Sequence, residues 1–135
     1  MHMQGEPATM QNSPSYNFTP IDIYIYLKKQ IDLLLSSGLP KSSIAVDVGI
    51  GFGKSVSDNL ALIDWMPLFH GLGVPILVGV SRKSTIGHID NDATVDKRLG
   101  GSLALTLRSV DAGVQMIRSH DIKETMQAIK LWQAS

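Results

Sequence analysis

The first long pattern of apolar residues in the chain is helical. Between residues 19 and 37, apolar side chains recur every three or four positions, which predicts an amphipathic helix. Thr19 is a suitable N-cap and Pro20 suits the first helical position. Gly38 follows as a typical helix stop, so we expect the helix to end there.

Three short apolar runs are predicted to be strands, at residues 44–46, 75–80 and 114–117. The run at 75–80 is continuously apolar, as expected for a strand that is covered on both faces. Helices are predicted after each strand. They cover 57–70 with Ser57 as cap, a stretch that ends near 110 after a polar loop at 88–95, and 121–133 with Asp121 as cap.

The predicted order is helix, strand, helix, strand, helix, strand, helix. Successive strands begin about 30 to 40 residues apart, which is the length of a βαβ unit. The sequence therefore predicts an α/β fold with parallel strands and right-handed crossovers. With 135 residues, 44% of them hydrophobic, the chain is expected to form one globular unit.

Composition and charge exclude several classes of function. The formal net charge is +0, so we expect neither a nucleic-acid surface nor an electrostatic membrane anchor. The chain has no cysteine, which excludes disulfides and thiol chemistry and is compatible with a cytoplasmic protein. No apolar stretch reaches the roughly 20 residues of a membrane span, and residues 1–5 do not have the pattern of a secretory signal.

Polar residues follow directly on the apolar part of each predicted strand. Asp47 follows the first, Ser81 and Lys83 the second, and Arg118 and His120 the third. In a parallel α/β fold these strand ends lie on one rim, where such folds bind ligands. The rim would be cationic, so an anionic substrate is the natural expectation.

Each of these residues also has a purely structural interpretation. An aspartate such as Asp47 is often a turn former or a cap, and His120 could be a structural histidine. Arg82 is more often a solvated charge or an ion-pair partner than a ligand residue. The N-termini predicted at Ser84 and Asp121 would add N–H groups that attract anions. Convergence of three strand ends favours the functional interpretation.

A glycine-rich loop, Gly49–Lys54, follows the first strand. A phosphate-binding P-loop would need glycine at position 48, which is Val48, and the dinucleotide-binding glycine spacing also fails. Three alternating glycines indicate unusual backbone dihedrals or a close approach by another group.

Five ordered motifs resemble those of dihydropteroate synthases. They are Met1–Gly5, Asp47 with Gly49–Lys54, Gly79–Ser84, Arg98–Ser102 and Arg118–Asp121. The resemblance covers the whole chain and implies a TIM (β/α)8 barrel. Residues 1–135 would form a partial pterin-binding domain, from the end of barrel strand five to helix eight, with the N-terminal half of the barrel absent.

The resemblance implies a folate-pathway transferase. Its members condense 6-hydroxymethyl-7,8-dihydropterin diphosphate with p-aminobenzoate, which gives 7,8-dihydropteroate and diphosphate. By position, the pterin would contact Met1, Asp47, Lys83 and Arg118, and the diphosphate Arg118 and His120. Lys83, Arg118 and His120 would therefore be the catalytic residues.

The same resemblance extends to other ligands. Phe52 and Ser84 would meet p-aminobenzoate, and this pocket would be the target of sulfonamides. The family implies Mg²⁺, whose asparagine ligand would lie in the absent half, so no metal ligand is expected in this chain. It further implies a cytoplasmic, homodimeric parent enzyme. One departure is Val48 in place of the family's proline, which would loosen the backbone of Asp47.

Two other functions remain open at this stage. One is a non-catalytic module that binds phosphate or a nucleotide on the cationic rim. The other is a different pterin-binding barrel, such as a folate-dependent methyltransferase. Such relatives share the pterin-binding aspartate but not the Ser81–Ser84 and Arg118–His120 motifs together.

Overall fold

The computed structural model describes residues 1–5 and 14–135. Its helices and strands are, in order, α1 (Thr19–Ser36), β1 (Val46–Asp47), α2 (Val56–Asp64), β2 (Ile76–Val78), α3 (Ser84–Ile89), α4 (Leu99–Asp111), β3 (Met116–Ile117) and α5 (Ile122–Ala134). Short 3-10 helices add η1 (Lys41–Ser43), η2 (Met66–Leu72) and η3 (Val95–Lys97). This alternation of strands and helices confirms the predicted α/β class.

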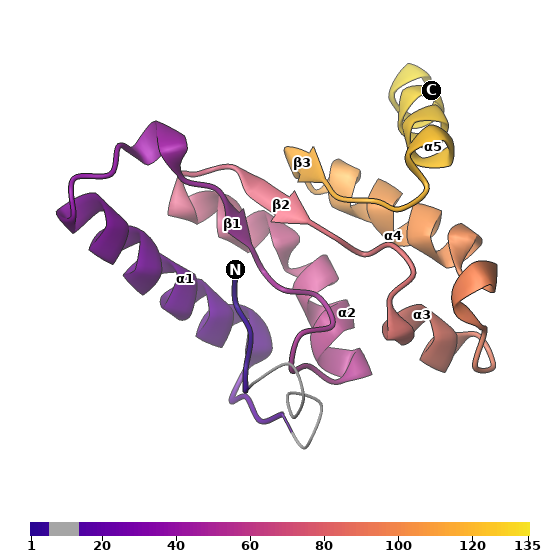
Figure 1. The fold of residues 1–135 in the computed structure, drawn as a ribbon, viewed down its shortest axis with the longest axis horizontal. Helices are drawn as coiled ribbons and strands as arrows, with labels where there is room; N and C mark the ends of the chain where they lie inside the picture. The colour runs from indigo at the N-terminus through magenta and orange to yellow at the C-terminus, as the bar shows by residue number, and fades with distance from the viewer. Residues whose placement is uncertain (6–13) are drawn as a thin grey trace.

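The strands form one parallel sheet in the order β1-β2-β3. Val46 pairs with Ile76 across the first interface, and Leu77 pairs with Met116 across the second. The N-terminal segment lies beside β1, where the His2 N–H donates to the Asp47 carbonyl at 3.0 Å. The chain ends at the tip of α5, beyond the β3 side of the sheet (Figure 1).

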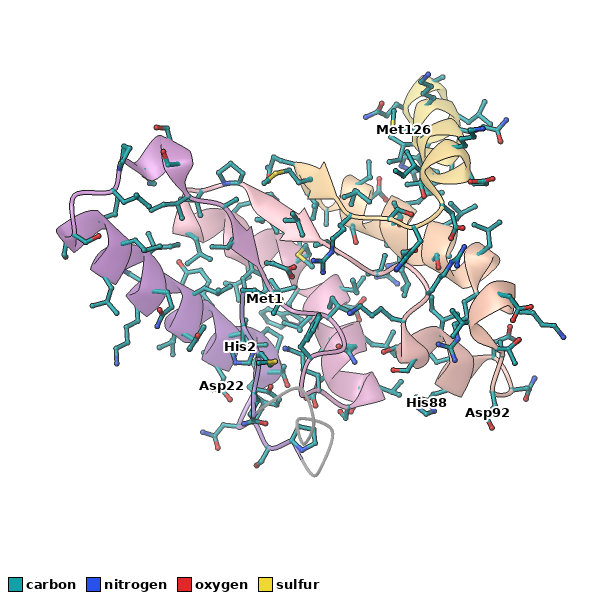
Figure 2. The ribbon with its side chains drawn as sticks, in the orientation of Figure 1. Met1, His2, Asp22, His88, Asp92 and Met126 are labelled. Atoms are coloured by element: carbon teal, nitrogen blue, oxygen red, sulfur yellow. The ribbon has the colours of Figure 1, made fainter. Side chains whose placement is uncertain are left out.

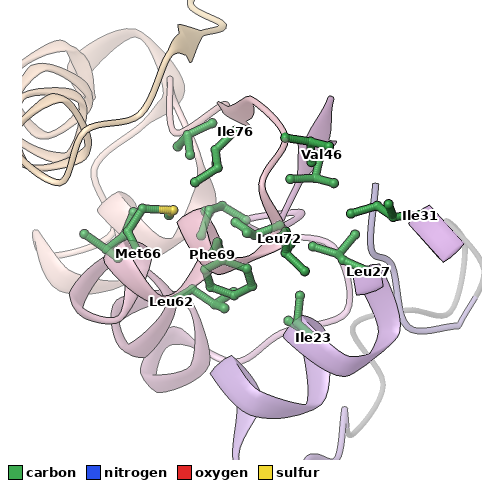
Figure 3. Packing of buried hydrophobic residues seen from close by; sticks show 14 of the residues in the cluster. Ile23, Leu27, Ile31, Val46, Leu62, Met66, Phe69, Leu72 and Ile76 are labelled. Carbon is green, nitrogen blue, oxygen red and sulfur yellow. The ribbon is translucent and has the colours of Figure 1, made fainter. Parts of the chain in front are cut away.

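The hydrophobic core lies between one face of the sheet and the helices that cover it. Figure 3 shows Ile23, Leu27 and Ile31 of α1 facing side chains of α2 and η2. These three α1 side chains are 5% exposed or less, because the apolar stripe of α1 points inward. The strands contribute Val46, Ile76 and Val78 to the same cluster, and Val48, directly after β1, joins them.

The expectation that both faces of the second strand are covered is wrong for the described residues. Ile76 and Val78 are 0% exposed, but Leu77 between them is only half-buried. Leu77 lines a hollow of about 380 Å³, together with Ile117 and Met126 of α5. Side chains alternate across a strand, so one face meets the helices while the other faces this hollow.

Two of the predicted N-caps are wrong. Phe18 is the N-cap residue of α1, and the Thr19 hydroxyl instead hydrogen-bonds the carboxylate of Asp58. Helix α2 is capped by Ser55 rather than Ser57. The Asp58 N–H donates to the Ser55 hydroxyl at 3.1 Å, and the Asp58 carboxylate accepts from the Ser55 N–H at 2.9 Å. This reciprocal pair is a capping box.

The other helix boundaries differ modestly from the prediction. Helix α2 ends at Asp64 and continues as η2, because Pro67 lacks the N–H that an α-helix needs. Helix α3 extends into the predicted loop, which turns at Asn91 and Asp92, both with positive φ. Helix α1 stops at Ser36, and Gly38 follows with φ 89° as expected of a stop residue.

Candidate active site

The three strand ends surround one hollow of about 410 Å³. Its lining comes from the glycine loop after β1, the end of β2 and the end of β3, and consists of Phe52, Gly79, Ser81, Lys83, Arg118, Ser119 and His120. Asp47 lies at its edge, because the carboxylate Oδ2 is 3.6 Å from a guanidinium nitrogen of Arg118. The predicted convergence of Asp47, Lys83, Arg118 and His120 is therefore observed.

Asp47 is held by its own turn. Its Oδ1 accepts a hydrogen bond from the Gly49 N–H at 2.7 Å, and its side chain is 13% exposed. Position 48, where the family has proline, is occupied by Val48, which is fully buried in the core. The hydrogen bond from Gly49 tethers the Asp47 carboxylate on this turn without a proline. The Arg118 guanidinium lies against Gly79, where a Cβ would be 3.0 Å from Arg118 Nε. Glycine at position 79 therefore makes room for the arginine.

Lys83 is half-buried against the glycine loop. Its Nζ lies 4.1 Å from the centre of the Phe52 ring, a cation–π contact. Burial lowers the pKa of Lys83, and repulsion from Arg118 lowers it further. The ammonium group is thus placed over an aromatic wall, with Gly51 close beneath its side chain.

His120 is oriented by the neighbouring strand end. The Ser81 Oγ lies 3.1 Å from the His120 backbone nitrogen and 3.0 Å from Nδ1 of its ring. Since Nδ1 is engaged, Nε2 is the ring nitrogen that can meet a ligand. Ser81 is buried, so this contact fixes an exposed imidazole to the rim.

Asp121 is the N-cap residue of α5, as predicted, but its side chain makes no capping hydrogen bond. Its carboxylate accepts two hydrogen bonds from Arg82, at 3.1 Å from Nε and 2.5 Å from the terminal nitrogen. These hydrogen bonds lower the pKa of Asp121. A planar guanidinium offers two parallel donors to a carboxylate, which one helix N–H cannot match. Arg82 is therefore the ion-pair partner that its structural interpretation expected.

Besides Asp47 at its edge, two predicted ligand residues do not line the central hollow. Ser84 begins α3 but is exposed and lines a separate hollow of about 620 Å³, beside Asn59 and Thr85. Met1 is 53% exposed and lies with His2 at the start of the chain (Figure 2). His88, which also belongs to α3, is exposed and lines the same hollow as Ser84.

The glycine loop is shaped by the N-terminal segment. Gly49 and Gly53 have φ of 74° and 64°, which side-chain-bearing residues rarely adopt. A Cβ at Gly49 would lie 1.9 Å from the carbonyl oxygen of His2, and one at Gly53 would lie 2.3 Å from that of Gln4. The predicted close approach is thus made by the chain's own backbone.

Sequence reasoning missed a buried polar pair behind this loop. The sequence gives Lys54 only a place at the end of an incomplete P-loop match, and no motif assigns a function to His2. Both are buried, and Lys54 Nζ lies 3.1 Å from His2 Nδ1. The one sequence signal was the position of Lys54 directly after three glycines whose backbone could wrap around an ammonium group.

The rim does not fit a metal ion. Residues 1–5 and 14–135 contain no cluster of three or more histidine, cysteine or acidic side chains that could hold one. The single carboxylate at the hollow, that of Asp47, already accepts from Gly49 and lies near a guanidinium. Among the same residues no helix is both long and apolar enough for a membrane span.

Residues 1–120 match the model of the pterin binding enzyme family. The chain belongs to this family. It is 42% identical to the dihydropteroate synthase of Haemophilus influenzae over 135 residues, which are 100% of this chain and 49% of that protein. The chain therefore spans about half the length of the curated relatives it matches, and it corresponds to their C-terminal half.

Solved structures of the family confirm the fold. The Yersinia pestis dihydropteroate synthase, solved with a sulfonamide drug complex, has a TM-score of 0.94 and 37% identity, over 98% of this chain and 48% of that one. The Xanthomonas albilineans enzyme in complex with 7,8-dihydropteroate has a TM-score of 0.89 and 34% identity, over the same 98% and 48%. These proteins are TIM barrels, so the predicted partial barrel is confirmed.

Proposed function

We propose that this chain is the C-terminal half of a dihydropteroate synthase domain and supplies one wall of its active site. The observation that carries the proposal is the convergence of Asp47, Lys83, Arg118 and His120 around one hollow. One carboxylate beside three basic groups suits a ligand with a hydrogen-bond-donating ring and an anionic tail. Dihydropterin diphosphate has both features.

The carboxylate of Asp47 would bind the amino-pyrimidine edge of the pterin. Two adjacent N–H donors on that edge match two carboxylate oxygens, and Oδ1 can still accept a second hydrogen bond. Lys83 would donate to the ring oxygen and nitrogen of the pterin from its place over Phe52. Met1 would pack against the pterin from the exposed start of the chain.

The diphosphate would be held by Arg118 and His120. Arg118 lies on the rim with its side chain 58% exposed, and it can stack on the pterin while its guanidinium donates to phosphate oxygens. Bond breaking at the pterin methylene places negative charge on the leaving diphosphate. Cationic donors fixed in advance stabilise that charge without reorganising.

The incoming p-aminobenzoate would lie on the Phe52 side. Phe52 would line its ring, and Ser84 at the start of α3 would meet its carboxylate from the adjoining hollow. A sulfonamide, which mimics p-aminobenzoate, would occupy the same space. Oriented binding of the amine next to the pterin methylene makes the bimolecular reaction effectively unimolecular.

The remaining features of the whole enzyme are part of the same proposal. We propose that the parent enzyme is cytoplasmic and homodimeric and that it uses Mg²⁺, which would help to neutralise the diphosphate. Among residues 1–5 and 14–135, the rim has no group of side chains that would hold that ion. Residues 1–135 would form the partial domain from the end of barrel strand five to helix eight.

A binding comparison tests the proposal against a nucleotide-binding module. Calorimetric titration of the purified chain with dihydropterin diphosphate and with ATP should show a preference for the pterin. The preference should be lost in Lys83→Ala and kept in Lys29→Ala, a change of an exposed lysine on α1. If the chain alone binds neither ligand, the titration is repeated after reconstitution with the N-terminal half of the Haemophilus influenzae relative. A preference for ATP in either form would contradict the proposal.

A further inference from the structure

Lys54 is a buried lysine that the proposed chemistry does not use. It is 3% exposed, although an ammonium group is costly to remove from water. Its Nζ donates to the carbonyl of Gly49 at 2.8 Å and to the carbonyl of Phe52 at 2.9 Å, and it lies 3.1 Å from Nδ1 of His2. An ammonium group has three donors, and here each has an acceptor.

These three acceptors belong to two different segments. Gly49 and Phe52 stand at the two ends of the turn that follows β1, and the Phe52 ring carries the Lys83 contact. His2 belongs to the N-terminal segment and directly follows Met1. Lys54 therefore ties the segment of the proposed pterin contact to the loop of the proposed p-aminobenzoate contact.

The charges around Lys54 agree with this arrangement. Burial lowers the pKa of Lys54 to about 8, which keeps it largely protonated at neutral pH. Burial, followed by the nearby Lys54 charge, lowers the pKa of His2 to about 4, so its ring is neutral and Nδ1 can accept. Asp47 and Asp58 favour the ammonium form of Lys54, while Lys83 opposes it.

We propose that Lys54 is a positioning residue that sets Phe52, and through it Lys83, in place by clamping the glycine loop to the N-terminal segment. It is too buried to meet a ligand, so it acts through the residues it holds. Other contacts support the same loop: the Asn59 side chain accepts from Gly51 N–H at 2.8 Å, and the Tyr16 hydroxyl donates to the Gly53 carbonyl at 2.6 Å. Within residues 1–5 and 14–135, Lys54 is the side chain that joins both ends of the turn to residue 2.

The inference rests on the proposed function for the importance of Phe52 and Lys83, but its test uses no ligand. In Lys54→Met, the ring-current shift of the Lys83 ε-methylene protons should disappear in NMR spectra. Exchange of the Phe52 amide should accelerate about tenfold, as expected for a lost charge-assisted hydrogen bond to its turn. Amide exchange in β2, and the spectrum of Lys29→Met, should stay unchanged. An unchanged Lys83 ε-methylene shift together with unchanged Phe52 amide exchange in Lys54→Met would overturn the inference.

A rescue experiment separates positioning from general stabilisation. The chain has no cysteine, so Lys54→Cys creates a unique thiol that can be aminoethylated in denaturant before refolding. The product restores an ammonium group at nearly the lysine length, and the Lys83 shift should return. Methylthiolation of the same thiol restores bulk without charge and should not rescue it. Equal recovery with both groups would overturn the inference.

A pH titration decides the matter if the Lys54 variants do not fold. In Lys83→Met, which removes the other titrating lysine of the site, the Gly49 and Phe52 carbonyl carbon signals should shift together with the Lys54 ε-carbon. The midpoint should lie above the pKa of about 8 that Lys54 has in the wild type, because Lys83 no longer opposes its charge. A neutral amine has only two N–H donors for three acceptors, so the clamp must change as the proton leaves. Carbonyl signals that ignore the Lys54 titration would contradict the proposal.

Discussion

Single polar side chains determine what the rim can bind. The Asp47 carboxylate is mostly buried and has one tether, so its remaining acceptor capacity faces the hollow in a defined direction. Ser81 orients the His120 ring through a hydrogen bond to Nδ1. The guanidinium of Arg82 forms an ion pair with Asp121 and does not line the hollow. In each case the partner decides whether the polar group can reach a ligand and in which direction it points. A substitution at one of these groups should therefore affect the part of the ligand that the group contacts.

Replacing Asp47 by asparagine should weaken pterin binding far more than p-aminobenzoate binding. The amide keeps the shape but presents an NH₂ donor where a second acceptor is needed, which costs on the order of 1.5–3 kcal/mol of pterin binding. Calorimetry with a pterin analogue measures the effect, with Asp90→Asn at an exposed position as control. Unchanged pterin affinity would mean that Asp47 is only a turn residue.

The stability of the protein should fall between pH 6.5 and pH 4 because of His2. The pKa of His2 is lowered to about 4 from 6.5, so in this window the unfolded chain binds more protons than the folded one. This contribution is fully present above pH 6.5 and is lost as the pH falls through about 4. A shift of this size corresponds to on the order of 3 kcal/mol.

Urea denaturation of the wild-type protein and His2→Gln at several pH values isolates that contribution. Carboxylates also titrate in acid, so the informative quantity is the difference between the two pH profiles of the free energy of unfolding. The His2→Gln profile should be flatter from pH 6.5 to 4. Two parallel profiles would show that His2 is not the group responsible.

At the scale of the elements, helix ends and loops place the rim residues. Helix α2 begins at a complete capping box directly after the glycine loop, so the loop that carries Phe52 runs into a fixed helix start. Helices α3 and α5 have no side-chain cap, and their first turns follow the Lys83 and His120 segments. The strongest local start signal is thus on α2, next to the buried Lys54.

Ser55→Ala should therefore destabilise the protein more than Ser57→Ala. The first change removes the hydroxyl that accepts from the Asp58 N–H, which typically costs about 1 kcal/mol in the free energy of unfolding. The second removes an exposed hydroxyl that contacts only Ser55 among the described partners. Chemical denaturation of both variants checks the order, and a larger loss in Ser57→Ala would contradict the observed cap.

At the scale of the whole molecule, the sheet is open. Strand β3 pairs only with β2 among the described strands, and the hollow beside it is walled by α5. Large apolar side chains of α5 are also exposed: Ile122 at 66%, Leu131 at 67% and Trp132 at 46%. A closed barrel leaves no strand edge, whereas an open sheet with an apolar flank favours association.

We expect the 135-residue chain alone to be inactive in dihydropteroate formation and to self-associate. The barrel relatives it matches are about twice as long, so residues that would complete the site and cover the open edge are not in this chain. Size-exclusion chromatography with light scattering over a concentration series, alongside an activity assay, measures both properties. A monomer that forms dihydropteroate would contradict this expectation.

The sequence by itself determined the features that depend on nearest neighbours and on periodicity. The apolar spacing of residues 19–37 predicted α1 nearly to its ends, because helical repeat and a stop glycine are local properties. Three apolar runs predicted three parallel strands, and the polar residues after them had to meet at one rim. Asp47, Lys83, Arg118 and His120 could therefore be predicted together.

Only the tertiary structure decided which partner each polar group takes. Asp121 binds Arg82 across 39 positions rather than its own helix, and Lys54 reaches His2 across 52. Ser84 belongs to the right segment yet faces a different hollow from Lys83. Such choices depend on distances between residues far apart in the chain and on how strongly burial favours paired charges, and neither is encoded in local pattern.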